Sequence, residues 1–180
     1  MSKLGRKNII LPKDSSIKVE GPSLTITGPK GSKKLSINDK IFSSKVSENE
    51  FQILPIQKSI DKKTSIMWGT YRSLINNAVK GVTLGHEKIL ELSGVGFRAN
   101  LKGQTLNLQI GFSHEINFDI PKEIKIVVEK QTIIKISGVD KELVSKIAAD
   151  IKNLKPVEPY KAKGIKERGQ FVLRKEGKKK

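Results

Sequence analysis

Residues 20–37 read EGPSLTITGPKGSKKLSI, and residues 102–120 read KGQTLNLQIGFSHEINFDI. In both stretches apolar residues alternate with polar ones on either side of a glycine-containing turn, which is typical of a β-hairpin. Aligning the two hairpins places Leu24 over Leu106, an offset of 82 residues. The chain of 180 residues therefore contains the same strand–turn–strand pattern twice.

A helical spacing of apolar residues follows each hairpin further along the chain. Spacings of three and four residues predict a first helix that ends at Gly81 and has this apolar face: Ile66, Met67, Tyr71, Leu74, Ile75, Ala78 and Val82. The second helix is expected to begin after the capping residue Asp140 and to end at Lys155-Pro156. Its apolar face comprises Leu143, Val144, Ile147, Ala148, Ile151 and Leu154. Asp61 aligns with Asp140 at an offset of 79 residues, so the duplication includes both helix starts.

These patterns predict an α+β protein made of two tandem duplicated domains, each a small, mostly antiparallel sheet packed on a helix. Further strands are predicted at Phe51 and in IKIVVEKQTIIKIS, residues 124–137. We place the domains at residues 1–82 and 83–155, and a basic C-terminal extension at residues 156–180. The extension contains too few apolar residues to predict a core strand.

Charge is concentrated at the two ends of the chain. Lys and Arg number 35 against 18 Asp and Glu, a net charge of +17. Residues 155–180 contain ten basic and three acidic residues, and residues 1–13 contain four basic residues and no acid. This distribution favours a polyanionic partner, with nucleic acid ahead of an acidic membrane surface. No apolar run is long enough for a secretory signal or a membrane span, so we expect a cytoplasmic protein.

The sequence offers little to catalysis. It contains no cysteine and two histidines, His86 and His114, neither of which lies in a cluster of potential metal ligands. GVGFRA, residues 94–99, matches a dinucleotide-binding pattern, but a hairpin pattern follows it instead of the helix that would hold a pyrophosphate. Ser113, His114 and Glu115 are adjacent on an expected strand, where neighbouring side chains point to opposite faces. We therefore expect no enzyme activity, cofactor, metal or small-molecule substrate.

The stretch PVEPYKAKGIKERG, residues 156–169, combines features that suit RNA. Tyr160 between basic residues offers a stacking surface beside phosphate-binding charge. Gly164 and Gly169 permit close approach to a ligand, and the prolines favour an extended backbone. A solvated tail kept for solubility is the alternative. We further expect residues 171–173 to dock on the second domain and residues 175–180 to be mobile without RNA.

Four stretches resemble the L-six family of bacterial-type large-subunit ribosomal proteins. The most specific is EPYKAKGIKERGQFVLRKEGKKK at the C-terminus, which resembles the signature of that family. LSGVGFRANLKGQTLNLQIGFSH is similar to its second-domain core, YRSLINNAVKGVTLGHEKILEL to its interdomain stretch and MSKLGRKNIILP to its start. The resemblance covers nearly the whole chain and implies two tandem α+β domains.

The resemblance also implies a function: binding large-subunit rRNA near the sarcin-ricin loop, beside neighbouring ribosomal proteins and close to the translation GTPases. The implied rRNA contacts are Tyr160, Lys161, Lys163, Gly164, Lys166, Arg168, Arg174 and Lys175, with Gly94, Gly96 and Arg98 as weaker candidates. The second domain is expected to supply most of the affinity. A free-standing RNA-binding or RNA-chaperone protein is the alternative, and its need for several stacking platforms fits poorly with nine aromatic residues.

Overall fold

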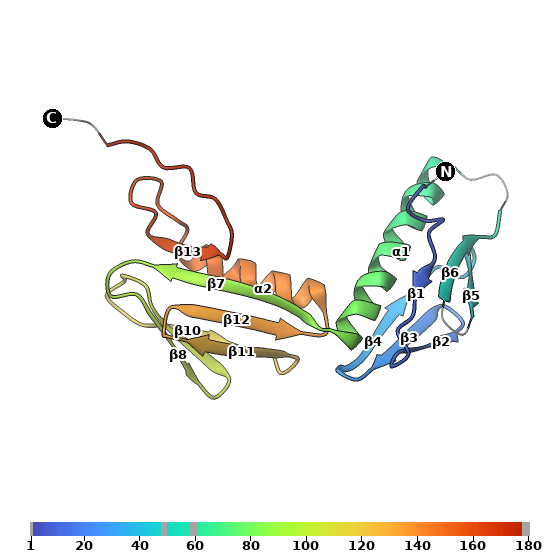
Figure 1. The fold of residues 1–180 in the computed structure, drawn as a ribbon, viewed down its shortest axis with the longest axis horizontal. Helices are drawn as coiled ribbons and strands as arrows, with labels where there is room; N and C mark the ends of the chain where they lie inside the picture. Colours follow the sequence, from blue (N-terminus) through green and yellow to red (C-terminus); the bar gives the residue numbers. More distant parts are fainter. Residues whose placement is uncertain (1, 48–49, 58–60, 178–180) are drawn as a thin grey trace. The chain divides into compact units, whose positions relative to one another are not determined.

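The computed structural model describes residues 2–47, 50–57 and 61–177 (Figure 1). The chain divides into two compact units: residues 1–85 with residues 139–141, and residues 86–138 with residues 142–180. In the described part of the chain each unit contains antiparallel sheets and one α-helix. The predicted tandem α+β architecture is confirmed.

The first unit contains six strands and a long helix within its described residues. The elements are β1 (Ile9–Ile10), β2 (Ser16–Glu20), β3 (Ser23–Gly28), β4 (Gly31–Ser36), β5 (Phe42–Val46), β6 (Glu50–Pro55) and α1 (Lys62–Thr83). One sheet has the order β2-β3-β4 and the other the order β1-β6-β5. Because α1 packs against β3, β4 and β6, it closes the core of both sheets (Figure 1).

The first quoted hairpin forms as predicted. β3 and β4 pair in antiparallel register, with Leu24 opposite Leu35 and Gly28 opposite Gly31. A two-residue turn therefore joins the strands, and Gly31 supplies the positive φ of +144° that residues with side chains rarely adopt. Leu24 and Ile26 point into the core from the central strand of this sheet.

α1 begins where predicted but ends later than predicted. The side chain of Asp61 accepts a hydrogen bond of 2.7 Å from the Lys62 N–H and so caps the first turn. The helix continues past Gly81 to Thr83, because the following residue, Val82, is fully buried in the core. A glycine ends a helix when the chain leaves with a positive φ, and here that position is Gly85, with φ +80°.

The apolar face of α1 also differs from the predicted one. Ile66 is 62% exposed, so it does not belong to the core-facing stripe. Trp68 is buried and its Nε1 donates a 2.8 Å hydrogen bond to the carbonyl oxygen of Ile53 on β6. The rings of Tyr71 and of Phe42 on β5 meet in a T-shaped arrangement, with centroids 5.4 Å apart. Aromatic side chains of α1 thus pack against the β1-β6-β5 sheet.

The second unit repeats this plan and adds a strand. Its elements are β7 (His86–Ser93), β8 (Arg98–Lys102), β9 (Thr105–Gln109), β10 (Ile116–Asp119), β11 (Ile124–Glu129), β12 (Ile133–Gly138), α2 (Lys141–Leu154) and β13 (Gly164–Glu167). The sheet orders are β10-β9-β8 and β11-β12-β7-β13. Leu106 lies on the central strand β9, as its counterpart Leu24 lies on β3, and both are buried.

α2 covers the four-stranded sheet with the face that the sequence predicts (Figure 1). Val144, Ile147, Ala148 and Ile151 are buried in the core of the second unit, and Leu143 and Leu154 pack at its border. The helix begins directly after Asp140 and ends at Leu154, before Lys155-Pro156. The predicted helix bounds are therefore confirmed.

The expectation that the C-terminal stretch makes no core strand is wrong. β13 pairs antiparallel with β7, and Lys166 lies opposite Glu91. Ile165 is fully buried among the core residues of the unit. One apolar residue suffices here, because the edge of β7 supplies backbone hydrogen bonds and the side chain of Ile165 packs into the core.

Candidate nucleic-acid interface

The chain between α2 and β13 forms a closed loop, residues 156–163. The Glu158 N–H donates to the Lys163 carbonyl oxygen at 2.8 Å, and the Ala162 N–H donates to the Glu158 carbonyl oxygen at 3.0 Å. These two bonds close the loop at its base, and Tyr160 and Lys161 form its tip. The Tyr160 side chain is 54% exposed, and Lys161 and Lys163 are exposed beside it.

Gly164 holds this loop against its own chain. Its φ is +141°, and a Cβ built on it would lie 2.7 Å from both the Pro156 carbonyl oxygen and the Val157 Cα. The residue is buried, and the backbone of residues 156–157 approaches it closely. Gly164 thus shapes the loop, and its predicted contact with rRNA stays a prediction.

Two of the predicted RNA-binding cations already have an acidic partner. Lys166 Nζ lies 3.4 Å from one carboxylate oxygen of Glu91, and Arg168 Nε lies 3.3 Å from the other. All three side chains are partly exposed to solvent, where ion pairs contribute little to stability. Phosphate groups can therefore compete with Glu91 for these cations.

Glu167 is held by two lysines on neighbouring elements. Its carboxylate accepts a 2.7 Å hydrogen bond from Lys88 Nζ on β7 and a 3.1 Å hydrogen bond from Lys152 Nζ on α2. The hydrogen bond from Lys88, followed by that from Lys152, lowers the pKa of Glu167 below its ordinary value. The ionised carboxylate thus joins β13 to both the sheet and the helix.

The chain after β13 turns back along the loop. The Lys175 N–H donates to the Pro159 carbonyl oxygen at 3.0 Å, which brings Arg174 and Lys175 next to the loop tip. The backbone of Lys175 therefore forms a hydrogen bond in the protein without RNA. Residues 178–180, the last part of the segment predicted to be mobile, lie outside the described residues. Phe171 is 86% exposed, so the predicted docking of residues 171–173 is not observed for its ring.

The weaker candidates Gly94 and Gly96 lie at the same end of the sheet. Gly164 on β13 pairs with Ser93 on β7, and the chain enters the 94–97 turn directly after Ser93. Gly96 has φ +78° and open space where a Cβ would stand. Strand β8 follows the turn and begins with the exposed Arg98, so the turn lacks the helix that a pyrophosphate site requires.

Exposed cations without a carboxylate partner surround the loop tip. Within the described residues no salt bridge involves Lys161, Lys163, Arg174 or Lys175. Their charges are available to a ligand, in contrast to those of Lys166 and Arg168 on β13. All of these cations were predicted from the sequence, but Glu91 and Glu167 were not, because strand register decides which acids lie beside a cation.

A second feature that the sequence analysis missed lies near the end of α2. Lys155 Nζ stands 4.6 Å from the centroid of the Phe112 ring, and His114 is stacked on that ring at a centroid distance of 6.1 Å. Phe112 and His114 belong to the bend between β9 and β10, so the expectation that His114 lies on a strand is wrong. The contact joins residues 43 positions apart, which no local pattern reveals.

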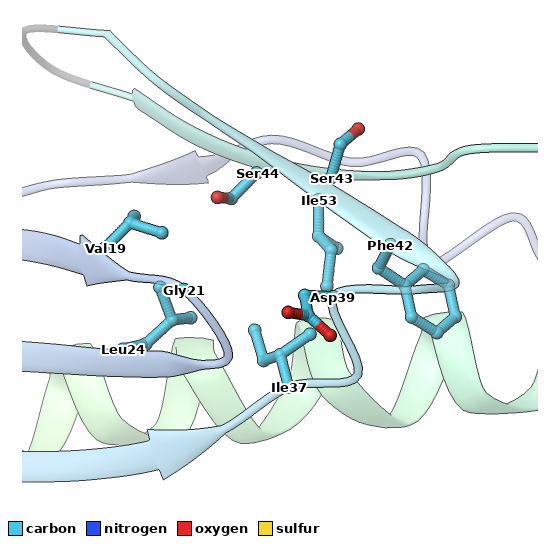
Figure 2. A pocket seen from close by; sticks show the side chains of 9 residues that line it. All are labelled: Val19, Gly21, Leu24, Ile37, Asp39, Phe42, Ser43, Ser44 and Ile53. Carbon is cyan, nitrogen blue, oxygen red and sulfur yellow. The ribbon is translucent and has the colours of Figure 1, made fainter.

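The first unit offers a small cavity (Figure 2). It is lined by Val19, Gly21, Leu24, Ile37, Asp39, Phe42, Ser43, Ser44 and Ile53, and its volume is about 20 Å3. That volume holds about one water molecule, whereas small-molecule sites occupy about 300–1,000 Å3. Over residues 2–47, 50–57 and 61–177, no three His, Asp or Glu side chains are grouped as metal ligands. No helix in this part of the chain has the length and hydropathy needed to cross a membrane.

A family model described as Ribosomal protein L6 matches the chain twice, at residues 11–85 and 93–168. The two matched segments coincide with the two copies of the repeat, which confirms the duplication inferred from the hairpins. The second segment extends through β13 and includes the basic loop.

Curated relatives match over the full length of both chains. The chain is 44% identical to "Large ribosomal subunit protein uL6" of Phenylobacterium zucineum strain HLK1 over 180 residues. It is 43% identical to the protein of the same name from Beijerinckia indica subsp. indica, and 42% identical to that from Sphingopyxis alaskensis.

Proposed function

The chain belongs to the ribosomal protein L6 family, and on that basis we propose that it binds large-subunit rRNA through the basic loop 156–163 and the tail that follows it. It is a structural constituent of the large ribosomal subunit and not an enzyme. Its work is to neutralise phosphates and to fix RNA tertiary contacts.

The observation that carries the proposal is the group of cations around Tyr160 that form no salt bridge with any described residue. Lys161 and Lys163 extend from the loop, and the hydrogen bond between Lys175 and Pro159 holds Arg174 and Lys175 beside it. A loop closed by its own backbone presents these charges without first being ordered by RNA. Preorganised charge loses less conformational entropy on binding than a mobile tail does.

The ion-paired cations have a second part in this proposal. Lys166 and Arg168 share Glu91 in the free protein, and their exposed pairs are weak enough for phosphate to replace the carboxylate. We expect them to contribute less affinity per charge than Lys161 or Lys163, because Glu91 remains nearby and repels phosphate. The turn at Gly94 and Gly96, with Arg98, borders the same surface.

A salt series with matched variants tests the loop. We expect the double variant Lys161→Gln, Lys163→Gln to bind deproteinised large-subunit rRNA more weakly, and to lower the slope of log affinity against log salt by about 1.5. The control removes the same charge from the opposite edge of the same sheet, with Lys122→Gln and Lys125→Gln next to and on β11. Equal slopes for the two double variants would contradict a binding surface at the loop.

The competing function is a free-standing RNA chaperone. Sucrose-gradient fractionation of a cell lysate separates the two, because a constituent of the large subunit sediments with it. A pool found mainly in the light fractions would contradict the assignment to the subunit. We propose a location on cytoplasmic ribosomes.

The finer position on the subunit follows from the resemblance to the family. We propose that the loop lies near the sarcin-ricin loop, beside other ribosomal proteins and within reach of the translation GTPases. Ultraviolet crosslinking of assembled subunits, followed by sequencing of the attached RNA, identifies the contacted nucleotides. Crosslinks from Tyr160 to a distant rRNA domain would overturn this placement.

A further inference from the structure

Phe112, His114 and Lys155 form an aromatic and basic cluster outside the loop 156–163. Phe112 and His114 lie on the bend between β9 and β10, and Lys155 follows the last turn of α2. The ammonium group stands 4.6 Å from the centroid of the Phe112 ring, within range of a cation–π contact. The Phe112 and His114 rings are 6.1 Å apart at an angle of 22°.

The fold does not use the Phe112 ring. The core of the second unit contains Phe97 among its buried residues and Phe118 at its border, but Phe112 is in neither set and is 45% exposed. Phe42, Phe51 and Trp68 of the first unit are buried as well. An aromatic ring at a bend, where a small polar residue would serve the backbone equally, presents to a ligand the part of its surface that Lys155 and His114 leave uncovered.

Lys155 is held in place by a backbone hydrogen bond. The Lys155 carbonyl oxygen accepts a 3.0 Å hydrogen bond from the N–H of Ile165, so the residue is anchored between α2 and β13. The neighbouring acid Glu115 is turned along the hairpin, where it accepts a 2.7 Å hydrogen bond from Gln109 Nε2. That hydrogen bond, the largest of several causes, lowers the pKa of Glu115.

We propose that Phe112, His114 and Lys155 form a stacking site for one unpaired base of the bound RNA. This proposal rests on the proposed function and specifies the kind of RNA that is bound. The second unit binds an RNA element that contains a loop or a bulge, because every base of a continuous duplex is already stacked between its neighbours. Single-stranded RNA segments are recognised by stacking of bases on Phe and His side chains. Lys155 then supplies a charge for the phosphate of the same nucleotide.

The test separates stacking from charge. The full-length variant Phe112→Leu keeps an apolar side chain but removes the ring, and Phe112→Trp keeps a ring. We expect Phe112→Leu to bind deproteinised large-subunit rRNA about fivefold to 100-fold more weakly, with an unchanged salt slope. Phe112→Trp should bind close to the wild type. Far-UV circular dichroism and thermal unfolding check that both variants are folded.

The outcomes distinguish this inference from the function beneath it. Wild-type affinity of Phe112→Leu, or an equal loss in Phe112→Trp, would overturn the stacking site and leave the binding surface at the loop unaffected. A loss that comes with a lower salt slope would also overturn it, because stacking on a neutral ring releases no counterions. Failure of the wild-type protein to bind this rRNA would overturn the proposed function itself.

Discussion

Replacing Gly164 with alanine should unfold the second unit at a lower urea concentration while leaving the first unit unchanged. Gly164 has φ +141°, and its Cβ position is 2.7 Å from backbone atoms of Pro156 and Val157. Gly169 provides a matched control, since its φ is +81° and nothing lies within 4 Å of its Cβ position. Gly169→Ala therefore carries the conformational penalty alone, and Gly164→Ala adds a steric one.

The two penalties can be sized separately. Backbone strain at a glycine-type conformation costs about 1–3 kcal/mol. Forcing a methyl group against a packed backbone costs about 1–3 kcal/mol more. We expect a loss of about 4 kcal/mol for Gly164→Ala and about 2 kcal/mol for Gly169→Ala. Against a total stability of about 5–15 kcal/mol, the first loss takes a large part of what the unit has.

The assay uses the single tryptophan as an internal reference. Trp68 is buried in the first unit, so its fluorescence reports the urea unfolding of that unit alone. Far-UV circular dichroism reports both units, and the transition absent from the fluorescence belongs to the second. We expect Gly164→Ala to shift that transition and to leave the fluorescence midpoint in place.

A destabilisation by Gly164→Ala no larger than that by Gly169→Ala would refute this reasoning. It would mean that the backbone of residues 156–157 moves away from the added methyl group at no cost. The closed loop would then be a soft element, and the preorganised charge on which the proposed function depends would be lost.

Three further outcomes are expected. Ile165→Ala should lower the free energy of unfolding of the second unit by about 2–5 kcal/mol in the same urea titration, because it removes a fully buried side chain. A chain that ends after Leu154 should unfold at lower urea than one that ends after Gly169, since only the longer chain keeps β13; equal midpoints would argue against a structural strand. At a pH above 4.5, the ordinary pKa of a Glu carboxyl group, Glu167→Gln should be less stable than the wild type. This difference in stability should vanish as the pH falls through the lowered pKa of Glu167 in the folded protein, because the protonated side chain loses its ion pairs. A difference that persists in acid would contradict the ion pairs with Lys88 and Lys152.

Local periodicity made most of the fold predictable. The hairpin at Leu24 and the face of α2 are specified by residues that are neighbours in sequence, and a pattern of two or 3.6 residues records them directly. The duplication reinforced these predictions, since each copy confirms the interpretation of the other. Both helix starts, at Asp61 and Asp140, were found in this way.

β13 could not be predicted because its cause is distant. GIKE contains one strong apolar residue, and it forms a strand because β7 offers an open edge more than 70 positions earlier in the chain. The same remoteness hid the Glu91 partner of Lys166 and Arg168. It also hid the contact between Phe112 and Lys155, which depends on where α2 ends relative to the bend between β9 and β10.

The pairing of β13 with β7 has a consequence for biosynthesis. β7 is translated more than 70 positions before the strand that covers its edge. The first unit can fold while synthesis continues, as N-terminal domains generally do. The edge of β7 stays open until β13 has been made, and the loop 156–163 cannot close before then, because it packs on Gly164, the first residue of β13. A nascent chain therefore cannot present the closed loop to RNA before β13 has been synthesised.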